Sequence, residues 1–129
     1  MIYNGFINDS SEIKDTVKAV LDSIESKVHL ESQTKYNVEL VLRELLNNGI
    51  IYSHSRIKFM IKMCGCGIKA AVIDSGNGFD YSKYIKKDIT SDDMLLSEGG
   101  RGIFISSYIC EKFTYNRKGN IVAIRMNLV

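Results

Sequence analysis

An aspartate followed by two glycines is the first group of residues here that could do chemistry. Asp74 closes the apolar run 70–73 and precedes Gly76 and Gly78. A carboxylate at the end of such a run begins close to the core and needs a hydrogen-bond donor. The amino group of adenine is a donor, whereas guanine presents an acceptor at the same place. Asp74 therefore gives a physical basis for choosing ATP over GTP, and the two glycines would let a nucleotide approach the backbone.

A second glycine cluster, Gly99-Gly100-Arg101-Gly102, stands just before a segment with helical spacing that begins at Ile103. Free N–H groups at a helix start, together with glycines, form an anion site, and Arg101 would add a charge-assisted bond to a phosphate. It is not a P-loop, because no Gly-Lys-Ser/Thr follows. The plainer interpretations are an ordinary turn after Asp74 and a connector with a solvated Arg101.

Glu44 and Asn48 lie four residues apart, so on a helix they share one face. A polar stripe of this kind is usually solvated. The more specific hypothesis is that the amide oxygen of Asn48 ligates Mg²⁺ while Glu44 acts as a base. Mg²⁺ takes oxygen ligands and retains waters, so one asparagine plus phosphates is a sufficient site.

The elements that must position these residues follow from the periodicity of apolar side chains. Asp9 and Glu12 have capping-box spacing ahead of a helix that ends near Lys27. A second helix is predicted over 32–48, with Gly49 as its stop. The remaining predictions are an edge strand at 2–7, strands at 57–63 and 68–73 around a turn at 64–67, a long loop at 76–98 with a helical turn near 92–96, a helix at 103–112, and strands at 113–117 and 121–128 around a Lys-Gly-Asn turn.

Strand pairs that follow one another without crossover helices predict an α+β fold. The expected architecture is a two-layer α/β sandwich, with helices on one face of a mixed, mostly antiparallel sheet. Residues 1–129 are expected to form a single domain, because no linker or repeat interrupts the chain.

Composition narrows the class of protein. A net charge of +2 without a basic, aromatic-rich stripe argues against nucleic acid as a partner. No signal segment or membrane-spanning run is found, so we expect a cytoplasmic protein that does not bind membranes. Three cysteines suit a reducing compartment. Cys64-Gly65-Cys66 could be half of a metal site, but a turn of small residues is the preferred interpretation.

Taken together, the segments resemble the GHKL ATPase superfamily of gyrase, heat-shock chaperone, histidine kinase and mismatch-repair ATPases. Residues 44–48 look like the N-box, 74–78 like the G1 box, and 100–105 like the G2 box. The resemblance implies the Bergerat ATP-binding fold, with ATP and Mg²⁺ as ligands and Asn48 at the magnesium position. The nucleotide-binding residues that it implies are Asn48, Asp74, Gly76, Gly78, Gly100, Arg101, Gly102 and Ile103.

Within that superfamily the chain is most similar to the bacterial anti-sigma-factor serine/threonine kinases. Glu44 stands where sensor histidine kinases usually carry Asn, and a carboxylate there could deprotonate a serine. This resemblance implies that the protein binds a sigma factor and phosphorylates a serine of an anti-anti-sigma (STAS-like) partner. It also suggests a homodimer, for which 1–6 and the first helix would offer a surface.

The chain departs from the family pattern in two places. Gly49 follows the magnesium asparagine where Ala is frequent, and Asn120 and Ile121 replace a frequent Thr pair near the adenine pocket. Two other functions therefore stay open. One is an ATP-binding interaction module without phosphotransfer, and the other is the ATP-binding part of a split two-component histidine kinase.

Overall fold

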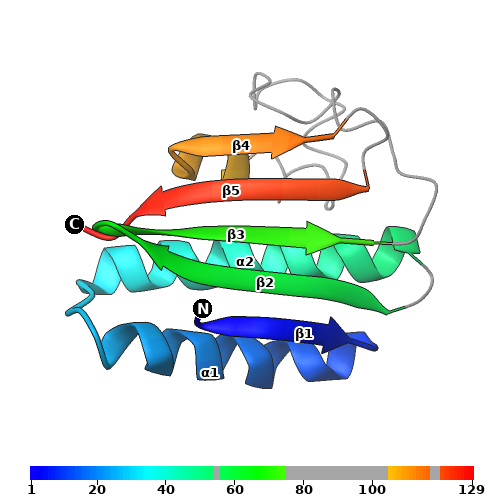
Figure 1. Cartoon of the computed structure of the whole chain (residues 1–129), viewed down its shortest axis with the longest axis horizontal. Helices are drawn as coiled ribbons and strands as arrows, with labels where there is room; N and C mark the ends of the chain where they lie inside the picture. Colours follow the sequence, from blue (N-terminus) through cyan, green and yellow to red (C-terminus); the bar gives the residue numbers. More distant parts are fainter. Residues whose placement is uncertain (54–55, 75–104, 117–119) are drawn as a thin grey trace.

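The described strands form one antiparallel sheet whose two edges come from distant parts of the chain (Figure 1). The computed structural model describes residues 1–53, 56–74, 105–116 and 120–129, and for Tyr52 it describes the backbone alone. The strands are β1 (Tyr3–Ile7), β2 (Ile57–Cys64), β3 (Gly67–Ile73), β4 (Lys112–Tyr115) and β5 (Ile121–Asn127). Their order is β1-β2-β3-β5-β4, which confirms the predicted edge position of the first strand and the central position of β3.

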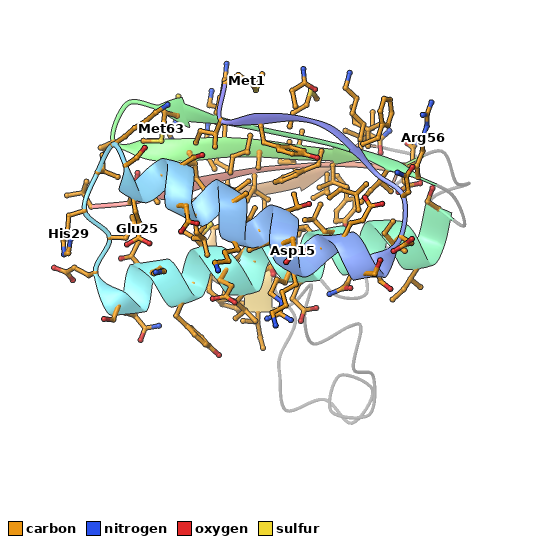
Figure 2. The ribbon with its side chains drawn as sticks, turned by 90° about the horizontal axis from the view of Figure 1, so that it is seen from below. Met1, Asp15, Glu25, His29, Arg56 and Met63 are labelled. Atoms are coloured by element: carbon orange, nitrogen blue, oxygen red, sulfur yellow. The ribbon has the colours of Figure 1, made fainter. Side chains whose placement is uncertain are left out.

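Two helices cover one face of this sheet and give the predicted two-layer α+β sandwich (Figure 2). They are α1 (Ile13–Glu25) and α2 (Ser32–Ser53), and residues 105–109 form a further short helix. Alternate residues of each strand point toward the helices, as a period of two requires. The buried side chains with the largest volumes include Phe59, Leu42, Leu45, Leu46, Ile57 and Ile61. Full burial of one such aliphatic or phenyl group contributes about 1.5–3 kcal/mol.

The first helix begins differently from the predicted capping box. Asp9 caps a short 3₁₀ turn, η1 (Ser10–Glu12), by accepting a hydrogen bond from the backbone N–H of Ser11 at 2.8 Å. Glu12 reaches back to the backbone N–H of Asn8 at 3.1 Å, so the reciprocal bond is made one residue before Asp9. The α-helix proper starts at Ile13 because the 3₁₀ turn occupies the preceding residues.

The prediction that Gly49 ends the second helix is wrong, because α2 continues to Ser53. A Cβ at Gly49 would lie 3.1 Å from Cγ1 of Val72 and 3.2 Å from Cδ1 of Ile57. The glycine therefore allows the helix to lie close against β2 and β3, and it is a packing residue rather than a stop. The predicted turn between these strands is confirmed, with Gly65 at a φ of 61°.

Several predictions about the second half of the chain lie outside the described residues. They are the loop at 76–98, its helical turn at 92–96, the start of the helix predicted at 103–112, and the Lys118-Gly119 part of the last turn. The described helical residues end at 109, and Lys112 already belongs to β4. The predicted helix is therefore too long at its end, while the antiparallel pairing of β4 with β5 is confirmed.

Candidate functional site

Asp74 lies at the C-terminal end of the central strand β3, where the sequence predicts it. It directly follows β3 and is 9% exposed. Its backbone N–H donates to the carbonyl of Asn120 at 2.9 Å, and the side-chain amide of Asn120 donates to the carbonyl of Asp74 at 3.3 Å. This double link fixes the backbone of Asp74 against the start of β5.

Asn48 faces the same region from the helix layer. It is half-buried on α2, and its amide nitrogen donates to the hydroxyl of Tyr115 on β4 at 3.4 Å. Because the amide nitrogen points to Tyr115, the amide oxygen is the atom left to accept a donor or to ligate a cation.

A narrow pocket between α2 and the sheet joins Asn48 to Asp74. Its polar lining comes from Asn48, Asp74, Tyr115 and Asn120, and its apolar lining comes from Leu45, Gly49, Val72 and Val122. Two residues predicted for one site from distant segments are thus brought together. The free space is about 10 Å³, room for roughly one water molecule, so a purine requires the pocket to widen.

Glu44 does not line the Asn48–Asp74 pocket but a different depression. It lies one helical turn before Asn48 and lines a separate depression of about 290 Å³, together with Tyr36, Glu39, Leu40, Arg43 and Asn47. Partial burial raises the pKa of the Glu44 carboxyl, and the charge of Arg43 opposes this shift more weakly. Arg43 is itself engaged with Glu39 at 3.4 Å. A carboxyl with a raised pKa is better matched to accepting a proton near neutral pH.

The turn after β4 contains a residue that the sequence did not reveal. The side-chain oxygen of Asn116 accepts from the backbone N–H groups of Asn120 and Ile121 at 2.9 and 3.0 Å. Its amide nitrogen donates to the side-chain oxygen of Asn120 at 2.7 Å. Asparagines that flank a turn are a cue for such bonds, but Asn120 was noted only as part of the predicted turn and as a departure from the family pattern. Nothing in the sequence indicated Tyr115.

The glycine-rich half of the predicted site lies outside the described residues. It comprises Gly76, Gly78, Gly100, Arg101, Gly102 and Ile103. Within the described ranges, no group of three or more His, Cys, Asp or Glu side chains is arranged to hold a metal ion.

The comparisons with known proteins give one family. Residues 9–126 match the sequence profile of the histidine kinase-like ATPase domain. The matched region spans Glu44, Asn48 and Asp74 as well as both glycine runs. No curated protein matches the chain.

Among the described helices, none is both long enough and apolar enough to cross a membrane.

Proposed function

Because the chain belongs to the histidine kinase-like ATPase domain family, we propose that it binds ATP with Mg²⁺ beside α2, where β3 ends and β5 begins. The observation that carries this proposal is the pocket shared by Asn48 and Asp74. One residue is suited to a cation and the other to the adenine amino group. Their meeting across 26 positions of sequence is what an adenine nucleotide with its metal requires.

Asp74 would recognise the base. Its carboxylate would accept a hydrogen bond from the amino group of adenine, a charge-assisted contact that is stronger than one between neutral groups. Asn120 forms hydrogen bonds with both the backbone N–H and the backbone carbonyl of Asp74, so the backbone that carries the carboxylate has a defined position. Guanine would place an acceptor against the same oxygens.

Asn48 would hold the metal. Its amide oxygen, for which the described residues provide no hydrogen bond, is a ligand of the type that Mg²⁺ prefers, and phosphate oxygens and waters would complete the coordination. When bound, Mg²⁺ neutralises charge on the phosphates of the nucleotide.

We further propose that the protein is a serine kinase of the anti-sigma-factor type, with Glu44 as the base. The proton of a serine hydroxyl would pass to the Glu44 carboxylate while the serine oxygen attacks the γ-phosphorus and ADP leaves. The depression lined by Glu44 shares no lining residue with the Asn48 pocket, and one helical turn separates Glu44 from Asn48, which suits access by a protein substrate next to the nucleotide. The proposed substrate is an anti-anti-sigma protein, a sigma factor is the proposed second partner, and a homodimer through 1–6 and α1 is proposed with them.

Phosphotransfer to purified anti-anti-sigma proteins from the same genome tests the kinase assignment. ATP labelled in its γ-phosphate should yield acid-stable phosphoserine with the wild type. Glu44→Gln should lower the rate by about 10²–10⁴-fold, the usual contribution of a general base, while ATP binding is retained. Glu39→Gln, a change of the same type in the same depression, is the matched control and should retain activity.

Three results separate the alternatives. Binding of ATP without label on any tested protein would contradict the kinase assignment and favour an ATP-binding interaction module. Acid-labile phosphohistidine on a partner would indicate a split two-component kinase. Equal loss of binding and transfer in Glu44→Gln would remove Glu44 from the role of base.

A further inference from the structure

The sheet has a second face that the helices do not cover. Figure 2 shows α1 and α2 on one side, while side chains on the opposite side, Met1 among them, project away from both helices. Figure 1 looks onto this open face, with the strands in front of the helices. It lies across the sheet from the Asn48–Asp74 pocket, so a role for this face does not depend on nucleotide binding.

Strand register places four cations side by side across this open face. Lys62 on β2 pairs with Lys69 on β3, Lys69 pairs with Arg125 on β5, and Arg125 pairs with Lys112 on β4. We call these four residues the basic row. Neighbouring strands lie only about 4.8 Å apart, and like charges directly opposite one another destabilise a sheet.

The positive charges of the basic row are only partly neutralised by ion pairs within the described residues. Arg125 forms an ion pair with Glu111 at 3.1 Å and donates to the sulfur of Cys64 at 3.0 Å. The three lysines are exposed, and within the described part of the chain none of them forms a salt bridge. The same field acts on Cys64, whose thiol pKa is lowered first by the hydrogen bond from Arg125 and further by the charges of the nearby lysines.

A row of small and apolar residues runs directly beside the cations. Met60, Ala71, Ala123 and Thr114 are paired across the same four strands, one step along the open face. The two alanines leave a depression of about 460 Å³ whose lining combines this row with the basic row and Met1. The surface therefore offers an apolar recess with a line of positive charge along one side.

We propose that this face binds a segment of a partner protein that presents apolar side chains beside a line of carboxylates. The carboxylates would neutralise the basic row, and the apolar groups would fill the recess. A second copy of the chain fits poorly, because a two-fold contact places a surface against itself and neither row contains a carboxylate. Nucleic acid is disfavoured because the two rows hold no aromatic side chain for base stacking. A bilayer calls for apolar groups that protrude, and this surface is recessed.

Fluorescence anisotropy with a designed probe tests the proposal. The probe is a peptide that presents a row of leucines beside a row of glutamates on the same face, and its counterpart carries glutamine in place of glutamate. The wild type should bind the glutamate peptide more tightly than the glutamine peptide. Lys62→Glu with Lys69→Glu should weaken binding by about tenfold or more. Lys14→Glu with Lys18→Glu, the same charge change on exposed positions of α1, should leave the affinity within about twofold.

Other results would overturn the proposal. Equal affinity of the two double variants would show that the basic row is not the site, and equal affinity for the two peptides would show that charge is not recognised. Tighter binding of a single-stranded oligonucleotide or of phosphatidylglycerol vesicles would assign the face to those partners instead. A wild-type dimer that sedimentation shows to dissociate in Lys62→Glu with Lys69→Glu would assign it to a second copy. If that variant does not fold, Lys69→Gln replaces it with the same criteria.

Discussion

Replacing Asn116 with alanine should destabilise the protein and loosen the backbone of Asp74. The change removes at least three hydrogen bonds, two accepted from the backbone N–H groups of Asn120 and Ile121 and one donated to the side chain of Asn120. At about 0.5–1.5 kcal/mol per bond, the loss is about 1.5–4.5 kcal/mol in the free energy of unfolding. Because Asn116 is only half-buried and water replaces some partners, the lower half of this range is expected.

Urea unfolding followed by circular dichroism measures this loss. Asn116→Asp is the matched control, because its carboxylate still accepts from both backbone N–H groups. Its second oxygen replaces the amide nitrogen that donates to the Asn120 oxygen, so the Asn120 amide must rotate to donate to it. The loss should stay below that of alanine, at about 0.5–1.5 kcal/mol. Equal losses in the two variants, or a loss below about 0.5 kcal/mol for alanine, would refute the assignment of the two backbone bonds to the Asn116 oxygen.

The remaining predictions concern ionisable and buried groups. The pKa of Glu44 is raised, so its carboxylate forms only as the pH rises through that higher value. The rate of phosphotransfer should therefore increase over the same pH range. A pH–rate profile of Glu44→Gln should lack this increase. For the same reason, the contribution of Glu44 to stability is greatest below its unfolded pKa and falls as the pH rises through the native pKa, so Glu44→Gln should not lower the melting temperature at neutral pH. The hydrogen bond from Arg125 lowers the pKa of Cys64, so in Arg125→Met a thiol reagent should react with Cys64 more slowly at neutral pH than in the wild type. Burial raises the pKa of Cys110 to about 12 and should keep that thiol unreactive until the protein unfolds. The Ser106 hydroxyl is fully buried and has no hydrogen-bond partner among the described residues, so Ser106→Ala should raise the free energy of unfolding by about 1–3 kcal/mol in a urea titration.

Local periodicity was sufficient to predict most of the described fold. The alternation of apolar and charged residues in β2 identifies a strand with one buried face, and the more apolar β3 is the central strand. Gly49 shows where local cues fail. A glycine after a helical run often marks a stop, but here contact with Val72 and Ile57 decides, and that contact depends on tertiary packing.

The candidate site was predictable only where single residues carry the chemistry. Asp74 and Asn48 could be chosen from their types and positions, and the structure places them on one pocket. The bonds of Asn116 depend on how the last two strands are joined, for which asparagines beside a turn are only a general cue. The basic row likewise appears only once strand register aligns residues that are far apart in the sequence.

Isothermal titration with ATP and with GTP, each with and without Mg²⁺, is the decisive test of the nucleotide pocket. We expect binding of ATP that depends on Mg²⁺, weaker binding of GTP, and loss of ATP binding in Asp74→Asn. Absence of binding at millimolar ATP, or equal binding of both nucleotides by the wild type and Asp74→Asn, would contradict the assignment of Asp74 and Asn48 to an adenine nucleotide and its metal.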